Sequence, residues 1–270
     1  MEGELSLTVY RNNCKIHGTA IVEPGVELGR NVEIGPYSII GKNVKIGDGT
    51  IIGAHVQIDG WTTIGKNNEV LTGASLGLPP QYSGYEGEKT FLIIGDNNVI
   101  REYVTMHRAT PDENNETRIG NNNLFMAYSH VAHDCTLGND IIMANSVNLA
   151  GHVTIENCVY LSGLVGVHQF VRIGKMTMVE DHTKVTKDIP PFLKVGGYPV
   201  SIHGLNHVGM RRHGISVEFR DEIEKAYNIL YNNDLNISQA IDRMDKELET
   251  GDDIEYIIRF IKSSTRGICR

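Results

Sequence analysis

Apolar residues recur at every sixth position along most of the chain. One unbroken series of twelve consists of Ile119, Phe125, Val131, Leu137, Met143, Leu149, Ile155, Leu161, Val167, Ile173, Val179 and Val185. An earlier series consists of Val22, Leu28, Ile34, Ile40, Ile46, Ile52, Ile58, Ile64, Val70 and Leu76. A period of six matches neither the 3.6-residue period of an α-helix nor the alternation of an exposed strand. It is typical of hexapeptide repeats, which wind into a parallel β-helix.

Each repeat should supply one short strand and one corner, with the apolar residue pointing inward. Three repeats would close one turn of about 18 residues, and successive turns would stack about 4.8 Å apart. Glycine follows the apolar residue in many repeats, at Gly29, Gly35, Gly41, Gly47, Gly53, Gly65 and Gly77. We expect these glycines, together with Asn31, Asn43 and Asn67, at corners where φ is positive.

Two polar segments interrupt the repeats, at residues 78–90 and 108–117. Both predict loop insertions that leave the coil and return to it. Loops of this length are more often functional than decorative, because binding and catalytic residues concentrate on loops held by a rigid scaffold. We therefore expect the candidate chemistry to lie near these two segments.

The repeats end near Pro190 and Pro191, which cannot donate to a β-ladder. Residues 192–214 predict an extended connector. From Ser216 onward apolar residues follow a helical period and predict three helices: Phe219, Ile223, Ala226, Tyr227 and Leu230; Ile237, Ile241, Met244 and Leu248; Ile254, Ile257, Ile258 and Ile261. The predicted division is a β-helix over residues 1–191 and a connector with a helical domain over residues 192–270, which would cover one end of the coil.

Composition narrows the functional classes. A net charge of −8 argues against non-specific binding of nucleic acid. The first eight residues lack the basic and apolar regions of a secretory signal, and no window of about 18 apolar residues predicts a membrane span. The four cysteines show no CxxC spacing, so reduced thiols and a cytoplasmic location are expected.

Four histidines of the second half, His130, His133, His152 and His168, are the first candidates for chemistry. With about 18 residues per turn, Gly151 lies one turn from His133, so the four imidazoles should line one edge of successive coils, about 5–15 Å apart. Histidine transfers protons near neutral pH. Asp134 follows His133 directly, and a bond between the two side chains requires a bent corner.

These residues leave three readings open. His133 could act as a general base while the Gly151 N–H stabilises an oxyanion. Three histidines could instead hold zinc, which would make the protein a hydratase that uses metal-bound hydroxide. Coils of this type usually assemble as trimers, so a non-catalytic trimeric scaffold is the third reading.

Six segments, taken in order, resemble a known family. They are residues 129–135, 149–153, 167–170, 188–191, 204–206 and 264–268, and they extend over nearly the whole chain. Together they resemble the UDP-N-acetylglucosamine acyltransferases of lipid A biosynthesis. The resemblance implies a mainly β fold, a left-handed parallel β-helix with a C-terminal three-helix α domain, which is an exception to the usual right-handed crossover. It also implies a homotrimer and a reaction that uses neither metal nor cofactor.

The implied reaction moves an acyl group from an acyl carrier protein thioester to the 3-position of a UDP-linked glucosamine. His133 matches the general base, Asp134 the residue that orients it, and the Gly151 N–H the oxyanion donor. The remaining matches are Gln81 in the first loop; His130, His152, His168 and Gln169 in the sugar and acyl groove; and Asn206 and Arg212 at the nucleotide. Arg211, Arg212, Arg220 and Arg243 would help to dock an acidic carrier protein.

Several positions depart from the family pattern. Tyr82 and Gly84 stand where an acidic residue and a lysine are usual. Glu180 and Asp181 fall where small or apolar residues usually set acyl length. A carboxylate that faces hydrocarbon is costly, so Asp181 predicts a short or hydroxylated acyl chain, or an acyl-CoA donor. In the alternative, both carboxylates face solvent at a corner.

The leading prediction is a cytoplasmic, trimeric acyltransferase that acts on a nucleotide-linked hexosamine without metal. One alternative is a nucleotide-linked amino-sugar N-acyltransferase that uses a short acyl-CoA; the other is the zinc hydratase. The sequence leaves open the acceptor atom, the nucleotide base, the donor and the acyl length.

Overall fold

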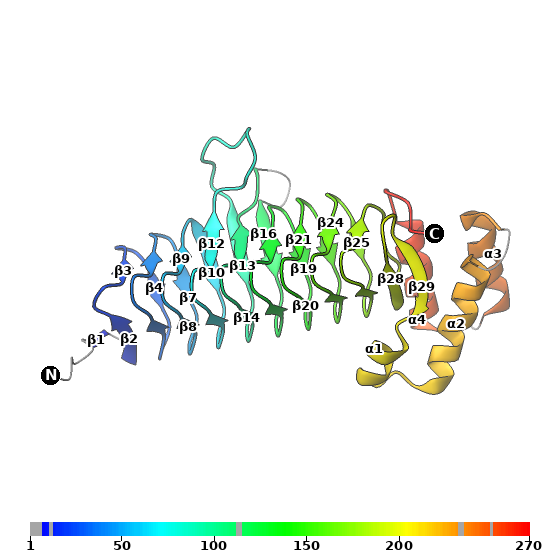
Figure 1. Ribbon diagram of the computed structural model, residues 1–270, viewed down its shortest axis with the longest axis horizontal. Coiled ribbons are helices and arrows are strands. Elements are labelled where there is room, and N and C mark those ends of the chain that lie inside the picture. The colour runs from blue at the N-terminus through cyan, green and yellow to red at the C-terminus, as the bar shows by residue number, and fades with distance from the viewer. Residues whose placement is uncertain (1–6, 11–12, 112–114, 232–234, 249–250) are drawn as a thin grey trace.

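The chain folds as a long prism of stacked coils with helices at its C-terminal end (Figure 1). The computed structural model describes residues 7–10, 13–111, 115–231, 235–248 and 251–270. Successive short strands enter three sheets in turn, so each sheet forms one face of the prism. The predicted parallel β-helix is confirmed.

The first face, sheet A, contains twelve strands among the described residues. They are β1 (Leu7–Tyr10), β2 (Cys14–His17), β5 (Glu33–Ile34), β8 (Ile51–Ile52), β11 (Glu69–Val70), β14 (Val99–Ile100), β17 (Leu124–Phe125), β20 (Ile142–Met143), β23 (Tyr160–Leu161), β26 (Met178–Val179), β28 (Leu193–Gly196) and β29 (Ser201–Leu205).

Sheet B follows sheet A around each coil. Its strands are β3 (Ile21–Val22), β6 (Ile39–Ile40), β9 (Gln57–Ile58), β12 (Ser75–Leu78), β15 (Thr105–His107), β18 (His130–Val131), β21 (Asn148–Leu149), β24 (Gly166–Val167) and β27 (Lys184–Val185). Sheet C closes the coil with β4 (Glu27–Leu28), β7 (Lys45–Ile46), β10 (Trp61–Ile64), β13 (Phe91–Ile94), β16 (Glu116–Ile119), β19 (Thr136–Leu137), β22 (Thr154–Ile155) and β25 (Arg172–Ile173).

The strand register confirms the predicted turn length. In sheet B His130 pairs with Asn148, Asn148 with Gly166, and Gly166 with Lys184, always 18 positions on. The register is longer only where the two loops leave the coil: Trp61 pairs with Phe91, and Phe91 with Glu116. The first loop lies between β12 and β13 and projects from the prism (Figure 1). The second lies between β15 and β16, and its residues 112–114 fall outside the described part of the chain.

The apolar residues of the six-residue series form the core. All twelve members of the series from Ile119 to Val185 are at most 3% exposed. Fully burying such a side chain contributes about 1.5–3 kcal/mol, so the column is the main source of stability. Val22 and Leu28, which begin the series from Val22 to Leu76, are only partly buried. Their strands β3 and β4 are terminal in their sheets and have a neighbour on one side only.

The corner prediction is confirmed for the asparagines and wrong for most of the glycines. Asn31, Asn43 and Asn67 have φ of 56°, 72° and 52°. Of the predicted glycines, Gly77 has positive φ (74°), but Gly35 and its equivalents do not. A Cβ on Gly35 would lie 2.6 Å from the carbonyl oxygen of Gly53 on the next coil. Glycine is therefore required there by close stacking of the coils rather than by the backbone dihedral.

The segment after Pro191 is more regular than predicted. Strand β28 pairs in parallel with β26, so sheet A continues past the expected end of the coil. Strand β29 returns antiparallel to β28, and the short helix α1 (His207–Arg212) follows. The extended connector is thus a hairpin and a helix, because the open edge of β26 supplies partners for one more strand. The division of the chain into domains at residues 191 and 192 stays a prediction.

Three further helices cover the C-terminal end of the prism, as predicted. They are α2 (Val217–Tyr231), α3 (Ile237–Glu247) and α4 (Asp252–Lys262). The Tyr227 hydroxyl on α2 donates to the Pro191 carbonyl at 2.6 Å, and the buried Asp188 carboxylate accepts from Ser264 at 2.7 Å. Both bonds tie the helices to the last coil. Among the described residues, no helix has the length and apolar character needed to cross a bilayer.

The close stacking of the coils predicts opposite effects for two glycine substitutions. In Gly35→Ala the new methyl meets backbone atoms that cannot move aside, so we expect the free energy of unfolding to fall by about 1–3 kcal/mol. In the matched control Gly163→Ala the methyl meets only an ordinary contact at 3.6 Å, so we expect a gain of about 0.4–1 kcal/mol. Urea unfolding followed by circular dichroism at one protein concentration measures both. Equal effects for the two variants would contradict the stacking argument.

Candidate active site

His133 and Asp134 form a hydrogen-bonded pair at the corner after β18. Asp134 adopts a φ of 59°, and its backbone N–H donates to Thr117 Oγ1 at 2.8 Å. This left-handed residue is the bent corner that the sequence required, because it turns the two adjacent side chains toward each other. His133 Nδ1 lies 2.7 Å from Asp134 Oδ2. With the carboxylate ionised, Nδ1 carries the proton and the lone pair of Nε2 is left as the basic site.

The Asp134 carboxylate stays ionised although its side chain is only 9% exposed. Burial raises the pKa of Asp134, but hydrogen bonds from His133 and Thr110 and the nearby His152 outweigh burial, so the net pKa is lowered. The Thr110 hydroxyl donates to Oδ2 at 2.7 Å. The pair can therefore bind and release a proton at His133 Nε2 while its carboxylate keeps its charge.

Gly151 lies directly against the His133 ring, one coil further along. A Cβ on Gly151 would be 2.5 Å from His133 Cε1, so only glycine leaves room for the imidazole. At a different corner, where sheet C passes into sheet A, the amide is occupied: the N–H groups of Arg30 and Asn139 donate to Asp48 and Asn157. The Gly151 N–H donates to no side chain or carbonyl among the described residues. It is thus available to a bound oxyanion beside the His133 base.

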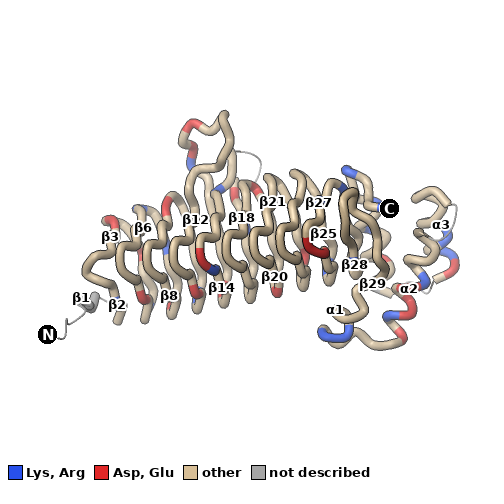
Figure 2. The backbone as a smooth tube through the Cα atoms, in the orientation of Figure 1, with Lys and Arg blue, Asp and Glu red and all other residues tan. Residues whose placement is uncertain are grey.

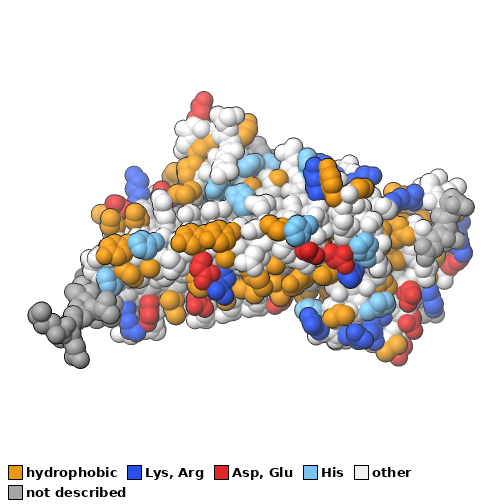
Figure 3. Space-filling view, viewed as in Figure 1, with side chains coloured by type: hydrophobic (Ala, Val, Ile, Leu, Met, Phe, Trp, Pro, Cys, Tyr) orange, Lys and Arg blue, Asp and Glu red, His pale blue; other side chains and the backbone are white. Residues whose placement is uncertain are grey.

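A groove of about 600 Å³ opens in front of His133 and follows the outer face of sheet B. It contains six of the predicted site residues: Gln81, His130, His133, Gly151, His168 and Gln169. Figure 3 shows histidine side chains gathered at the foot of the projecting loop. The structure therefore brings together the first loop and the histidine edge, and the roles of these residues in binding remain predictions.

The groove also contains residues that were not anticipated, among them Asn148, Gly166 and Lys184. They continue from His130 in steps of 18, each one position before an inward-pointing residue. The same register that placed Gly151 beside His133 therefore contained the signal for them. Tyr82 in the projecting loop also lies near the base, with its ring centroid 6.3 Å from that of His133.

The other predicted residues lie outside this groove. His152 packs edge-on against His133 at 5.4 Å, and its Nε2 is 3.6 Å from Asp134 Oδ2. Asn206 caps helix α1 and donates to the Met176 carbonyl, and Arg212 lies exposed at the end of the same helix. Neither residue lines the groove of its own chain, so their role at the nucleotide stays a prediction.

Asp181 also lies outside the groove. Its side chain is 71% exposed and contacts His182 at 2.9 Å. Glu180 contacts Lys194 at 2.8 Å and His203 at 2.9 Å. In a single subunit neither carboxylate faces the groove, and the effect of Asp181 on acyl length stays a prediction.

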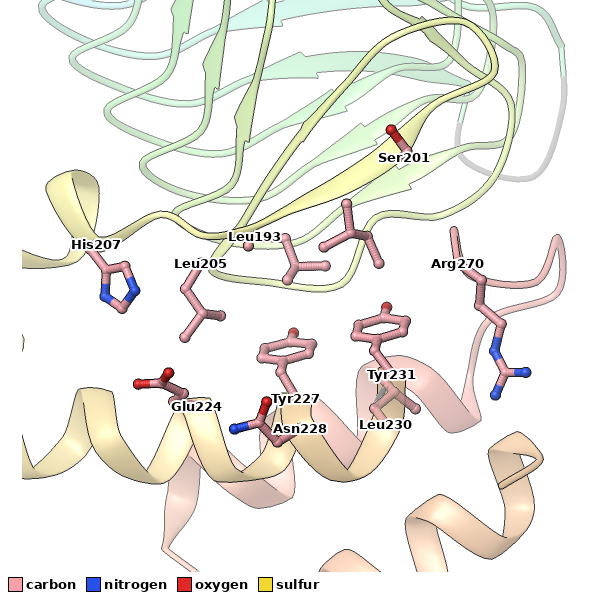
Figure 4. Close-up of a pocket in the computed structure, with 12 residues that line it drawn as sticks. Leu193, Ser201, Leu205, His207, Glu224, Tyr227, Asn228, Leu230, Tyr231 and Arg270 are labelled. Atoms are coloured by element: carbon pink, nitrogen blue, oxygen red, sulfur yellow. The ribbon is translucent and has the colours of Figure 1, made fainter. Parts of the chain in front are cut away.

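A second cavity of about 540 Å³ lies between β29 and α2 (Figure 4). Leu193, Leu205, Tyr227 and Tyr231 line it, and the Tyr227 and Tyr231 hydroxyls are already bonded to backbone carbonyls. It contains none of the predicted catalytic residues, of which His133 and Gly151 line the groove instead.

Asp134, His133 and His152 are also a geometric candidate for a metal, since one ligand atom from each lies within 4.8 Å of the others. The Asp134 Oδ2 atom that faces both rings already accepts hydrogen bonds from Thr110 and His133. Its lone pairs are directed at these two donors, so the arrangement fits a proton-transfer pair better than a metal-ligand set.

Two family models match the chain. One, described as UDP-N-acetylglucosamine O-acyltransferase, domain 2, covers residues 188–269; the other, bacterial transferase hexapeptide, covers residues 11–42. An acyl-(acyl-carrier-protein)–UDP-N-acetylglucosamine O-acyltransferase from Halorhodospira halophila is 46% identical, over 95% of this chain and 99% of the relative. The protein of the same name from Thiobacillus denitrificans is 48% identical, over 94% and 99%. The chain belongs to the family of UDP-N-acetylglucosamine O-acyltransferases.

Solved structures of UDP-N-acetylglucosamine O-acyltransferase family members agree with this assignment. The UDP-N-acetylglucosamine acyltransferase from Bacteroides fragilis is 41% identical with a TM-score of 0.91, and covers 94% of this chain and 99% of its own. The Arabidopsis enzyme is 30% identical with a TM-score of 0.82, over 94% and 100%. The predicted left-handed parallel β-helix and the predicted acyltransferase class are confirmed. The relatives are named O-acyltransferases, so neither the amino-sugar N-acyltransferase nor the zinc hydratase is favoured.

In this UDP-N-acetylglucosamine O-acyltransferase family member a buried imidazole, that of His107, packs behind the groove residue His130 and stays neutral well below pH 7. Burial, and then the neighbouring His130, His133 and Arg108, lower the pKa of His107 to about 4. Burial, and then His133, also lowers the pKa of His130. The rings of His107 and His130 pack edge-on at 5.1 Å. Both rings are thus neutral at physiological pH, His130 in the groove and His107 buried against it.

The lowered pKa of His107 predicts a pH-dependent stability. The unfolded chain binds a proton at this residue below about pH 6.5, whereas the folded chain does so only near pH 4. The free energy of unfolding therefore has its full value above about pH 6.5. It falls as the pH drops toward about 4, and His107 accounts for about 3 kcal/mol of this loss. In His107→Phe this loss should be absent. Urea unfolding of both proteins between about pH 7.5 and about pH 4 measures the difference. Parallel stability curves for the two proteins would contradict it.

Proposed function

We propose that this protein transfers an acyl group from an acyl carrier protein thioester to the 3-hydroxyl of UDP-N-acetylglucosamine, an early reaction of lipid A biosynthesis. The observation that carries the proposal is the His133–Asp134 pair, whose ring lies against the available amide of Gly151 in an open groove. The names of the relatives specify an acyl carrier protein donor and a UDP-N-acetylglucosamine acceptor. Base, oxyanion donor and groove are the parts that acyl transfer requires.

The proposed reaction is a direct displacement at the thioester carbonyl. His133 Nε2 takes the proton of the sugar 3-hydroxyl as its oxygen forms a bond to the carbonyl carbon. The Gly151 N–H donates to the oxygen that becomes negative in the tetrahedral intermediate. As the C–S bond breaks, the proton on His133 passes to the departing thiolate. Asp134 holds Nδ1 throughout and stabilises the imidazolium that forms between the two steps.

The groove residues would bind the two substrates. We assign Gln81, His130, His168 and Gln169 to the sugar and the acyl chain, because they line the groove on both sides of His133. We keep His152 in this set through its contact with the His133 ring. Asn206 and Arg212 would hold the nucleotide of a neighbouring subunit's substrate, since neither reaches the groove of its own chain.

A homotrimer would place Asn206 and Arg212 of one subunit near the groove of its neighbour, in a cleft between the two subunits. Large apolar side chains lie exposed along the corner between sheets A and B, including Tyr37, Tyr103, Tyr128 and Leu164, each more than half exposed. Tyr103 and Tyr128 stack on each other at 5.3 Å, and hydrophobic side chains form a band along the prism (Figure 3). An exposed apolar band of this kind fits a subunit interface better than free solvent.

The helical end would receive the carrier protein. Arg211 and Arg212 lie on α1, which has no acidic residue, and Arg220 lies among acidic residues on α2 (Figure 2). The donor we propose is an acidic protein, which these arginines would attract. The four cysteines are free, which agrees with the cytoplasmic location that we propose.

The general-base role predicts the behaviour of His133→Ala. Without an acceptor for the sugar proton, we expect the rate of acyl transfer to fall by about 10²–10⁴-fold while the oligomeric state is retained. The measurement is turnover of UDP-N-acetylglucosamine with a 3-hydroxyacyl carrier protein, with the product identified by mass spectrometry. His17→Ala, on β2 far along the prism, is the matched control and should keep the full rate. A His133→Ala protein that turns over like this control would overturn the proposed mechanism.

The oxyanion role predicts the behaviour of Gly151→Ala. The new methyl would displace the His133 ring and crowd the amide, so we expect a loss of about 10²–10³-fold in kcat. Gly163→Ala is the control: Gly163 lies at a less crowded position, so this variant should keep the wild-type kcat. If Gly151→Ala keeps it as well, the amide does not act at the reacting carbonyl.

A further inference from the structure

We propose that Thr110 is a positioning residue of this reaction: its hydroxyl holds the Asp134 carboxylate on His133 and keeps it from turning to His152. The inference rests on the proposed function, because it assigns Thr110 a role through the His133 base. Nothing in the family motifs of the sequence includes Thr110, which lies in the second loop.

Both ends of the second loop contact Asp134. At its start, Thr110 Oγ1 donates to Asp134 Oδ2 at 2.7 Å, and the Thr110 N–H lies 3.2 Å and 3.3 Å from Oδ1 and Oδ2. At its end, Thr117 Oγ1 accepts from the Asp134 N–H at 2.8 Å. Thr110 is 4% exposed and Thr117 is fully buried. The loop therefore fixes both the side chain and the left-handed backbone of Asp134.

Asp134 Oδ2 has two possible imidazole partners. His133 Nδ1 lies 2.7 Å away, and His152 Nε2 lies 3.6 Å away. A modest rotation of the carboxylate would exchange the first partner for the second, and His133 would lose the contact that orients its ring. The Thr110 hydroxyl donates to the same oxygen, so it sets the rotation at which the His133 bond is short. Hydrogen bonds to a charged group are among the strong ones, and a buried carboxylate has few alternatives.

The protonation of Asp134 is consistent with this role. Burial raises the pKa of the carboxyl, and the hydrogen bonds from His133 and then Thr110 lower it again. Thr110 thus also helps to keep the carboxylate charged in a site that is nearly closed to water.

The test uses three variants of the full-length protein. Thr110→Val keeps the shape and removes the hydroxyl, and Thr110→Ser restores the hydroxyl. Thr90→Val is the matched control, because the Thr90 hydroxyl is buried without a hydrogen-bond partner among the described residues. If Thr110→Val does not fold, Thr110→Ala makes the same loss with more room. The readouts are kcat, KM for the nucleotide sugar, and the pH dependence of kcat/KM.

We expect kcat of Thr110→Val to fall by about tenfold or more with KM unchanged, and Thr110→Ser to recover most of the loss. Because His133 loses its carboxylate partner, the acidic limb of the pH profile should move to lower pH. A purely structural role would not move this limb. Two outcomes would overturn the inference. One is a kcat of Thr110→Val within about twofold of the kcat of Thr90→Val, and the other is an equal loss of kcat in Thr110→Val and Thr110→Ser.

The result separates this inference from the proposed function. If His133→Ala is inactive and Thr110→Val is fully active, Thr110 has no positioning role and the base remains. If His133→Ala is active, the proposed mechanism fails whatever the Thr110 variants show.

Discussion

The structure depends on the stacking of identical turns. In the regular turns each strand residue pairs with the residue 18 positions further on, at the strand spacing of about 4.8 Å. Side chains at equal positions of successive turns therefore form straight rows. One row is apolar and fills the prism. Another places Gly151 against His133, and a third extends from His130 to Lys184 along the groove. The core, the contact between Gly151 and His133, and the groove are thus three consequences of one register.

The candidate site depends on a corner amide that lacks a protein partner among the described residues. At several corners an aspartate or asparagine of the next turn accepts the exposed amide, as Asp48 does for Arg30 and Asn157 for Asn139. Such bonds satisfy backbone donors that would otherwise lack a partner. At Gly151 the next turn offers Gln169, which lines the groove and accepts no bond from that amide. The amide on which the proposed oxyanion site depends is therefore a corner donor that the scaffold leaves open.

Prediction from the sequence succeeded where the spacing stayed constant. The apolar row, the edge of histidines and the contact between Gly151 and His133 all follow from counting, and each was confirmed. Counting failed for the glycines after the apolar residue, because close approach of the next coil and positive φ select the same residue type. It also failed at residues 193–205, where an open strand edge, invisible in the sequence, recruits a hairpin.

The sequence by itself determined the turn length, the interior row and the neighbours of His133 within the regular coil, because each depends only on a fixed period. Only the tertiary structure decided what the two loops contact, since an insertion breaks the period and its return path depends on packing. Thr110 meets Asp134 from 24 residues away across such an insertion. The Asp134 carboxylate is therefore held by a contact that no repeat spacing contains.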